Sequence, residues 1–506
     1  MAAASLFLGI DIGTGGSKAL LIDAQGRVAA KALTEYPLSS PRPLWSEQSP
    51  EQWWEATIVS IRAVIAQADI EPRAIAGVGL TGQMHGLVLL DGRGGVLRPA
   101  ILWNDQRTQA QCEAIHQRIG RERIMAITGK PMLTGFTAPK LLWVKDHEPE
   151  VYARIAHILL PKDYVRYRLT GEFFSDVADA SGTSWFDCRR RAWSEELIEA
   201  LEIPRDWLPQ VTESPVASAK VSVAGASATG LLEGTPVIAG AGDQAAEAVG
   251  SGIIAPALGI VSVTVGTSGV VFAAMGDYRI DPTGGMHAFC HALPGMWHVM
   301  GVMLSAGGSL RWFRDVLGGG ATYEQIIDSA RTVPAGCEGL VFLPYLSGER
   351  TPHADPNARG AFVGLTLRHT KAHLARAVLE GVTFGLRNAL DLARHMGVGI
   401  ERIRVSGGGA RSAFWKQMMA DVFAVPVASP QVVEGAAYGA AILAAVGAWG
   451  YPGVREAVAA MVNEGDEVRP GSRTGAYEEV YGLYNGLYPA LKPHFEAVAT
   501  EAGAMS

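Results

Sequence analysis

The sequence is poor in cysteine and contains no run of basic residues. Its four cysteines, Cys112, Cys188, Cys290 and Cys337, are scattered and form no C-x-x-C pair, so the sequence indicates neither a zinc site nor a disulfide framework and favours a reducing cytoplasm. The formal net charge of −7 argues against nucleic acid or an anionic membrane as a partner. Because 48% of the 506 residues are hydrophobic and 18% are charged, two or more sizeable domain cores are expected.

Long apolar runs are also scarce. Two stretches without charged residues, between Glu247 and Asp277 and between Glu434 and Arg455, have the length of a membrane span. The first is rich in β-branched residues and predicts paired buried strands. The second has alanine and glycine at every third or fourth position, which predicts a helix packed closely on a neighbour. No membrane role is expected, and the N-terminus has no basic start and does not resemble a signal peptide.

Two common nucleotide-binding signatures are missing or misplaced. No G-x-x-x-x-G-K-[ST] sequence occurs, so a P-loop is excluded. Gly77, Gly79 and Gly82 match G-x-G-x-x-G after an apolar run, with Asp105 roughly where a dinucleotide fold places its acid. However, the apolar runs on either side of residues 91–95 predict a hairpin there, not the helix that a pyrophosphate requires. A dehydrogenase is therefore disfavoured.

One short motif occurs twice. IDIGTGGSK at residues 10–18 and VTVGTSG at 263–269 are each a β-branched run that ends in Gly-Thr, the pattern of two strands joined by a tight turn. Glycine lets the backbone approach a ligand, and concave arrays of N–H groups bind anions. Each turn is therefore a candidate phosphate cradle, and one copy in each half indicates a duplicated phosphate clamp. The alternative is that both are ordinary hairpin turns.

The order of predicted elements repeats as well. Each half has a strand hairpin, an amphipathic helix and then a further strand, at residues 6–31, 53–68 and 74–82 and again at 259–274, 371–396 and 402–412. Alternating strands and helices predict an α/β fold of two lobes with a cleft between them. We place the boundary near Val249, which gives lobes at residues 1–249 and 250–506.

Two aspartates are candidates for the chemistry. Asp243 follows a short apolar strand and precedes an alanine-rich helix, so its carboxylate is expected at a strand end facing the cleft, where it can take a proton from a hydroxyl. A helix cap is the alternative. Asp11 ends the first strand beside the Gly-Thr turn and is placed to hold Mg²⁺ through water, since Mg²⁺ prefers one or two carboxylates with phosphate oxygens. A structural aspartate that fixes the hairpin is the alternative.

Longer motifs resemble the FGGY family of carbohydrate kinases, in the right order along nearly the whole chain. They are DIGTGGSK (11–18), GFTAPKLLW (135–143), GAGDQAA (240–246) and VSGGGARSAFWKQMMAD (405–421). The resemblance implies an actin/hexokinase-like fold of two ribonuclease-H-like lobes that close on ATP, Mg²⁺ and a sugar. Motifs that look like those of members acting on D-xylulose are PLWSEQSPEQWW (43–54), GLTGQMHG (79–86), LRPAILWND (97–105), LLPKDYVRYRLTGEF (159–173) and LSGERTPH (346–353).

The resemblance also implies roles for single residues. Asp243 would be the general base on the 5-hydroxyl of D-xylulose, with Asp11 and Asp243 beside Mg²⁺. The residues implied to contact the sugar are Met84, His85, Trp103, Asn104, Asp105, Asp243 and Gln244. Those implied to bind ATP are Gly13, Thr14, Gly15, Lys18, Gly266, Thr267, Gly307, Gly408, Gly409 and Ser412. For Trp103 a core role is the alternative.

Some alternatives stay open. Met84-His85 stands where glycerol kinases are expected to carry Arg-Glu, which argues against glycerol, but Gln244 leaves ribulose, an alditol or gluconate as possible acceptors. A non-catalytic sugar sensor is a further alternative. Glu349 and Arg350 either form a buried ion pair or line the cleft. The expected partners are a sugar and ATP, with neither nucleic acid nor membrane, and the family suggests a homodimer in the cytoplasm.

Overall fold

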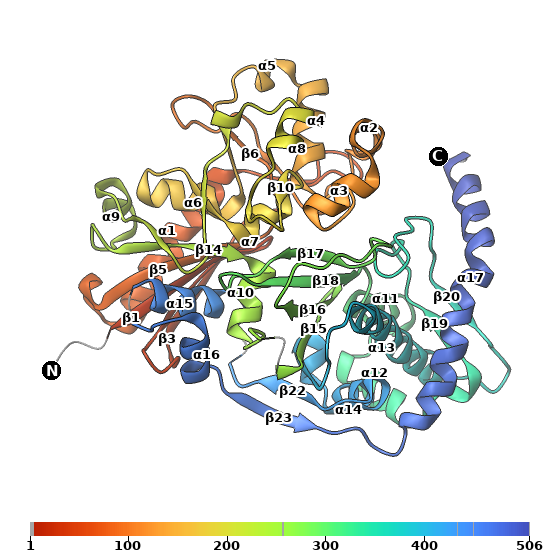
Figure 1. Cartoon of the computed structure of the whole chain (residues 1–506). Coiled ribbons are helices and arrows are strands. Elements are labelled where there is room, and N and C mark those ends of the chain that lie inside the picture. The colour runs from red at the N-terminus through yellow and green to blue at the C-terminus, as the bar shows by residue number, and fades with distance from the viewer. Residues whose placement is uncertain (1–4, 256–257, 433, 449, 505–506) are drawn as a thin grey trace.

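The chain forms two α/β lobes, each built on one large sheet (Figure 1). The computed structural model describes residues 5–255, 258–432, 434–448 and 450–504. The first sheet has six strands in the order β13-β14-β5-β1-β2-β3, namely β1 (Leu6–Ile12), β2 (Gly16–Ile22), β3 (Val28–Glu35), β5 (Ile75–Gly82), β13 (Ala217–Lys220) and β14 (Pro236–Gly242). The second has seven in the order β17-β18-β16-β15-β21-β22-β23, namely β15 (Ile260–Val265), β16 (Gly269–Met275), β17 (His287–Cys290), β18 (Trp297–Met303), β21 (Arg402–Gly407), β22 (Val427–Pro430) and β23 (Glu464–Val468).

The two sheets share one pairing scheme. In the first, β1 pairs antiparallel with β2 and parallel with β5, which in turn pairs parallel with β14. In the second, β15 pairs antiparallel with β16 and parallel with β21, which in turn pairs parallel with β22. The predicted duplication and both predicted hairpins are therefore confirmed, and each Gly-Thr turn lies at the same place in its sheet.

Helices cover both faces of the first sheet. The helix α1 (Pro50–Ala68) packs on β2 and β3 and buries Trp53, Ile61 and Val64. It begins slightly before the predicted start, because proline is favourable in a first helical turn, where its missing N–H is not needed. On the other face lie α10 (Asp243–Gly250) and α15 (Ala436–Gly447), which also pack on each other.

The helix α15 is the close-packed helix expected in the uncharged stretch from Glu434 to Arg455, within which Trp449 lies outside the described residues. A Cβ added to Gly79 would lie 2.0 Å from a carbonyl oxygen of α15, and one added to Gly439 would lie 1.7 Å from a carbonyl oxygen of α10. Only glycine permits backbones to approach so closely. Small side chains therefore hold α10 and α15 against each other and against β1 and β5.

The chain crosses between the lobes late in the sequence. After β22 it leaves the second sheet, forms α15 on the first sheet and α16 (Val454–Met461) beside it, and then returns as β23. Phe7 and Ile238 of the first sheet share one hydrophobic cluster with Phe272 of the second and Leu443 of α15. All strands of the first sheet precede residue 249 and all those of the second follow residue 250. The helix α15 follows residue 250 in the sequence but packs on the first sheet. The predicted domain boundary near Val249 therefore stays a prediction.

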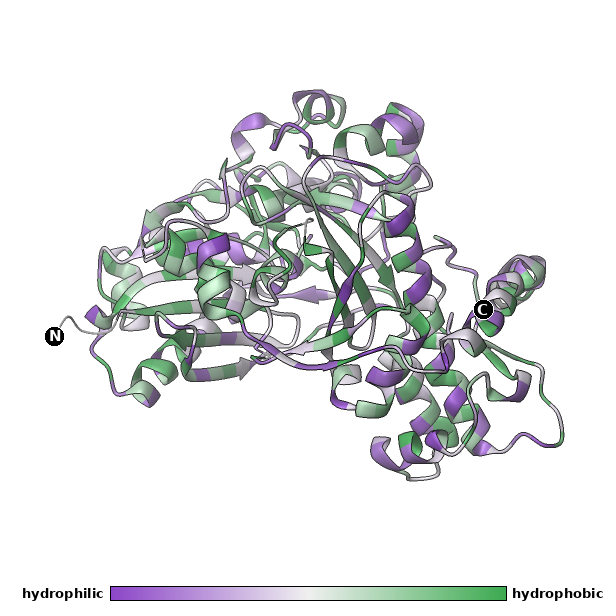
Figure 2. Ribbon diagram, turned by 60° about the horizontal axis from the view of Figure 1, so that its bottom comes forward, coloured by the Kyte–Doolittle hydropathy of each residue, from purple (hydrophilic) through white to green (hydrophobic). Residues whose placement is uncertain are grey.

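The second sheet is covered by the helices of the C-terminal half. They are α11 (Gly307–Leu317), α12 (Tyr323–Arg331), α13 (Lys371–His395), α14 (Ala413–Phe423) and α17 (Thr474–Ala504). The helix predicted at residues 371–396 is confirmed as α13, and it is followed by Gly397, which has the left-handed φ of 82° common after helix ends. Figure 2 shows hydrophobic residues concentrated in the central strands and hydrophilic residues on the outer helices. Within the described ranges, none of the helices combines the length and apolar character that a transmembrane span needs.

A layer of short elements extends the first lobe above its sheet in Figure 1. It contains β4 (Glu47–Gln48), β6 (Val88–Leu90), β7 (Ala100–Ile101), α2 (Gln109–Ile119), α3 (Arg121–Thr128), α4 (Thr137–His147), α5 (Pro149–Tyr152), β8 (His157–Leu159), α6 (Pro161–Thr170), β9 (Phe174–Asp176), α7 (Val177–Ala180), β10 (Phe186–Asp187), β11 (Ala192–Trp193), α8 (Glu195–Ala200), β12 (Gln210–Thr212) and α9 (Val223–Thr229). The predicted turn at residues 91–95 is present, with the Asp91 N–H donating to the Gly95 carbonyl at 2.9 Å. After β5 the chain forms β6 and β7 and not a helix, which agrees with the prediction against a dinucleotide-binding fold.

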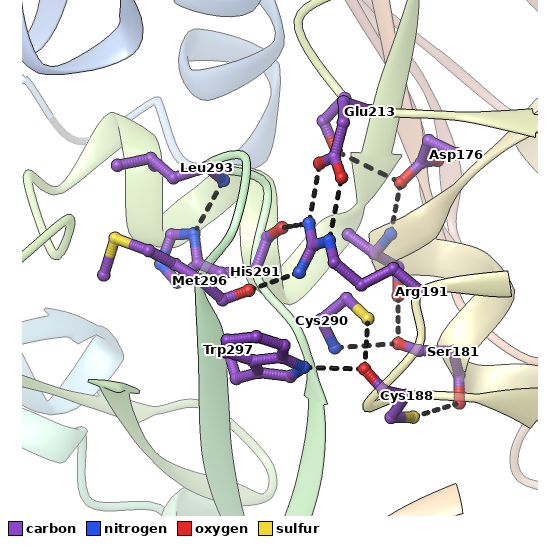
Figure 3. Close-up of polar contacts among 12 residues, drawn as sticks. Asp176, Ser181, Cys188, Arg191, Glu213, Cys290, His291, Leu293, Met296 and Trp297 are labelled. Atoms are coloured by element: carbon purple, nitrogen blue, oxygen red, sulfur yellow. Dashed lines mark hydrogen bonds and ion pairs between the residues drawn. The ribbon is translucent and has the colours of Figure 1, made fainter. Parts of the chain in front are cut away.

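The hairpin of β17 and β18 joins the two lobes through polar contacts (Figure 3). Arg191 of the first lobe forms an ion pair with Glu213 at 2.6 Å and donates to the carbonyl of Met296 at 2.6 Å. Trp297 of the second lobe donates through Nε1 to the carbonyl of Cys188 at 2.6 Å. The Arg191 guanidinium thus bridges a carboxylate of the first lobe and the backbone of the second. These contacts hold the two lobes together at the β17–β18 hairpin.

Candidate active site

Asp11 lies on β1 opposite Lys18 of β2, directly before the first Gly-Thr turn. Its Oδ1 is buried and has no hydrogen-bond partner in the part of the chain that the structure describes. Burial raises its pKa to about 6, against the opposing effect of the Lys18 charge and with a further increase from Glu247. A carboxylate oxygen in this condition is ready to accept a ligand that donates or carries positive charge.

The first Gly-Thr turn is tied to the predicted sugar motif. Trp103 Nε1 donates to Thr14 Oγ1 at 3.0 Å, and Thr14 Oγ1 donates to Gln83 Oε1 at 3.1 Å. Gln83 directly precedes Met84 and His85 in the chain. A single chain of hydrogen bonds therefore connects the predicted phosphate loop with two segments predicted to contact the sugar.

Asp243 is the first residue of α10, and the N-cap position belongs to Gly242. Its Oδ1 accepts from the backbone N–H of Gln244 at 2.7 Å, and no side-chain capping bond is formed. Burial raises the pKa of Asp243 to about 8, and the nearby charges of Asp11 and Glu247 contribute to the increase. The two predicted catalytic carboxylates are thus close enough to influence each other, and Asp243 does not serve as a conventional cap.

Met84 lies beside Asp243, and His85 follows it in the chain. A Cβ on Gly242 would lie 2.7 Å from Met84 Cγ, so the methionine packs directly on the residue that precedes Asp243. His85 Nδ1 is 2.9 Å from the carbonyl oxygen of Gly182, which can only accept, so Nδ1 carries the proton. Burial lowers the pKa of His85 well below 6.5, and the charge of Lys140 adds to this effect. The neutral ring therefore presents Nε2 as a hydrogen-bond acceptor.

Of three further residues predicted to contact the ligands, two already form ion pairs within the protein and one has a buried oxygen without a partner among the described residues. Asp105 is fully buried, accepts from the Ser46 N–H at 2.7 Å and pairs with Arg107 at 2.7 Å. Lys18 Nζ pairs with Glu434 at 2.6 Å. Asn104 has a buried Oδ1 without a hydrogen-bond partner among the described residues. The binding roles of these three residues stay predictions, and the existing ion pairs of Asp105 and Lys18 occupy much of their bonding capacity.

The second lobe contains a cavity of about 810 Å³, within the usual size of a cofactor site. All the ATP-binding residues predicted in the C-terminal half line it, namely Gly266, Thr267, Gly307, Gly408, Gly409 and Ser412. The carbonyls of the second Gly-Thr turn accept hydrogen bonds from the first N–H groups of α11, including the Gly307 N–H to Gly266 at 2.8 Å. Sequence reasoning missed Arg311, Tyr323 and Arg411, which also line the cavity. Arg411 lies inside a quoted motif, whereas the other two carried no signal.

A contact that the sequence did not indicate joins α10 to the second sheet. Glu247 Oε1 accepts from Ser406 Oγ at 2.8 Å and from Thr264 Oγ1 at 3.2 Å. These hydroxyls come from β21 and β15, next to the second Gly-Thr turn. The helix that carries Asp243 is therefore bonded to the strands that hold the nucleotide cavity. Glu247 is four positions after Asp243 on the helix, so a polar residue one turn after the proposed base is the signal that was available.

Two lobes with the same strand order, a Gly-Thr hairpin in each and carboxylates at their junction define a phosphotransferase of the actin/hexokinase-like ATPase fold. Models of the FGGY family of carbohydrate kinases match the chain in both parts, the N-terminal domain at residues 6–250 and the C-terminal domain at 261–448. The chain belongs to this family and is an ATP-using carbohydrate kinase.

Individual relatives match over nearly the full length. A xylulose kinase of Escherichia coli (strain K12) is 42% identical over 495 residues, which cover 96% of this chain and 99% of the relative. A xylulose kinase of Klebsiella pneumoniae is 45% identical over 82% of this chain and 84% of its own length. A crystal structure described as a xyloylose kinase from Brucella ovis superimposes with a TM-score of 0.90 at 41% identity, covering 96% of this chain and 99% of that one.

Proposed function

We propose that this protein transfers the γ-phosphoryl group of ATP to the 5-hydroxyl of D-xylulose and so forms D-xylulose 5-phosphate. The observation that carries the sugar assignment is the end-to-end match, at 42% identity, with a relative named xylulose kinase. The placement of Met84 against Gly242 supports it, because Met84 stands beside the proposed base and His85 directly follows Met84 in the chain.

Asp243 is the proposed general base. In a loose phosphoryl-transfer transition state, the attacking hydroxyl loses its proton late, and a carboxylate within hydrogen-bond reach receives it. A base with a pKa near the working pH is well matched to this transfer, and the pKa of Asp243 is about 8. His85 Nε2, as an acceptor, orients a second hydroxyl of the sugar, while the Gly-Thr turns position the phosphates.

Asp11 and Asp243 are the proposed residues beside Mg²⁺. They fit this ion because Asp11 Oδ1 is buried without a partner among the described residues, and burial raises the pKa of both carboxylates. The charge of Glu247 adds to the increase in both, and the charge of Asp11 adds to that of Asp243. No group of three or more His, Cys, Asp or Glu side chains within the described ranges could hold a metal by itself, so phosphate oxygens and water would complete the coordination. Bound there, Mg²⁺ would offset the charge of the transferring phosphates.

ATP is proposed to bind in the cavity of the second lobe, with its phosphates directed toward the two Gly-Thr turns. The cytoplasmic location and the homodimer stay predictions. A kinase for another ketose or a polyol would share all these features except the contacts of the sugar pocket.

The test is ADP release with ATP and Mg²⁺ over a panel of D-xylulose, D-ribulose, L-ribulose, glycerol, D-gluconate and xylitol, with Asp243→Asn as the blank. We expect a strong preference for D-xylulose that the substitution removes. Preference for a different sugar would reject the substrate assignment and retain the kinase mechanism. Absence of ADP release with every sugar would favour a non-catalytic sensor.

A further inference from the structure

The loop that contains Glu349 and Arg350 is fixed to the second sheet. Glu349 is buried, and its Oε1 accepts from the backbone N–H groups of Leu304 at 2.9 Å and of Arg350 at 2.8 Å. On the other side, the Thr351 N–H donates to the carbonyl of Val302 at 3.0 Å. Arg350 is therefore held between two residues that are anchored to β18 or to the chain directly after it.

The Arg350 side chain points away from this anchor toward the first lobe. Among the described residues its guanidinium takes part in no hydrogen bond and in no ion pair within 4.0 Å, so the alternative of a buried pair with Glu349 is not formed. A Cβ on Gly135 would lie 4.0 Å from Arg350 Nη2 and 2.3 Å from the carbonyl oxygen of Trp103. A cation of the second lobe thus reaches the segment that carries a predicted sugar contact of the first.

A continuous series of contacts leads from Asp243 to Arg350. Gly242, next to Asp243, packs on Met84. The following residue, His85, contacts the ring of Phe136 at a centroid distance of 4.8 Å. Phe136 directly follows Gly135, which faces the guanidinium. Arg350 therefore stands at the opposite end of this series from the proposed base. Its charge also lowers the pKa of His85, in agreement with their proximity.

The hydrogen-bonding groups at the two ends of this series differ, with acceptors near Asp243 and donors at Arg350. Asp243 and His85 Nε2 are acceptors, which suit the hydroxyl groups of a sugar, whereas a guanidinium has five donors and no acceptor. The keto group of an open-chain ketose is an acceptor only. If the 5-hydroxyl lies at Asp243, the keto end of the five-carbon chain lies toward Arg350.

We infer that Arg350 is a specificity-determining residue that donates from the second lobe to the keto oxygen of the sugar, and so favours ketoses over the corresponding alditols. This inference rests on the proposed kinase function and deepens it, since it assigns the ketose selectivity to a residue outside the Met84-His85 motif.

The test compares D-xylulose with xylitol, in which the keto group is reduced, for the wild type, Arg350→Met and Arg350→Lys. We expect Arg350→Met to lower kcat/KM for D-xylulose by about 10- to 100-fold, mainly through KM, which is the usual worth of a hydrogen bond from a charged donor. The loss with xylitol should be several times smaller. Arg350→Lys keeps the positive charge but not the planar, forked guanidinium, so its loss of kcat/KM for D-xylulose should lie between those of the wild type and Arg350→Met. Arg368→Met, at a side chain 80% exposed, is the matched control and should behave as the wild type.

Equal losses on the two substrates, or no loss on D-xylulose, would overturn the inference. Melting temperatures of all variants separate misfolding from lost contacts, and if Arg350→Met does not fold, the comparison rests on Arg350→Lys. If the wild type prefers a different ketose, the proposed substrate is wrong, and that ketose with its alditol replaces the pair and decides the role of Arg350. If only sugars without a keto group are phosphorylated, both proposals fail.

Discussion

Replacement of Asp243 by asparagine should remove activity and at the same time stabilise the protein. The substitution keeps the size of the side chain and an acceptor for the Gln244 N–H, but it removes the base. We expect kcat to fall by about 10² to 10⁴, the usual contribution of a general base, which equals about 3 to 5 kcal/mol of barrier.

The expected gain in stability follows from the pKa. Burial raises the pKa of Asp243 from 3.8 to about 8, so the folded state prefers the protonated carboxyl. The stabilisation by that proton is fully present below pH 3.8 and is lost as the pH rises to about 8. By linkage, the ionisable carboxyl costs at most about 5 kcal/mol at pH 8 but only about 2 kcal/mol at pH 5. Asparagine avoids this cost at every pH.

Melting curves of the two proteins at pH 5 and pH 8 provide the measurement. Unfolding entropy grows with chain length, so at 506 residues each kcal/mol changes the melting temperature by about 1 °C. Asp243→Asn should therefore melt up to about 5 °C above the wild type at pH 8 and up to about 2 °C above it at pH 5. The exposed Asp206→Asn is the control and should change neither property. Normal activity would refute the assignment as base, and a gain equal at both pH values would refute the raised pKa.

Three further substitutions test other parts of the structure. Gly266→Ala should raise the KM for ATP about tenfold or more with an unchanged melting temperature, because the nearest described neighbour of the added Cβ is 3.6 Å away and only a bound phosphate would be displaced; a normal KM would contradict this. Glu247→Gln should move the acid limb of the kcat/KM profile to lower pH, since the Glu247 charge raises the pKa of Asp243, and an unmoved limb would count against it. Gly439→Ala should destabilise the protein by about 1 to 3 kcal/mol, because its Cβ would lie 1.7 Å from a carbonyl oxygen of α10, whereas Gly482→Ala, with no neighbour within 4 Å, should be neutral or stabilising in urea unfolding.

Local patterns predicted the elements of the fold well. The β-branched runs that end in Gly-Thr at Thr14 and Thr267 indicated both hairpins, because turn chemistry acts over a few residues. The position of α15 did not follow from the sequence, since its alanine-rich surface suits any close neighbour, and only the tertiary structure places it on β1 and β5.

Local motifs also indicated candidate site residues, but not the contacts that these residues make with distant segments. Asp11, Asp243 and His85 could be proposed from the sequence because each lies near the end of a strand inside a recognisable motif, and their roles stay predictions. Sequence reasoning assigned Asp105 to the sugar without considering Arg107, only two positions later, with which it forms a buried ion pair. The direction of Arg350 depends on hydrogen bonds between distant segments, which no local pattern encodes.

The late crossing of α15 has a consequence for synthesis of the protein on the ribosome. The N-terminal half emerges first, yet the part of the sheet around Gly9 and Gly79 lacks its covering helix until residues 436–447 have been made. Nascent chains that stop earlier expose this apolar face and are prone to associate with one another. The two sequence halves are therefore not independent folding units, and a first half expressed alone should need the late helix, supplied on a second fragment, to reach its native state.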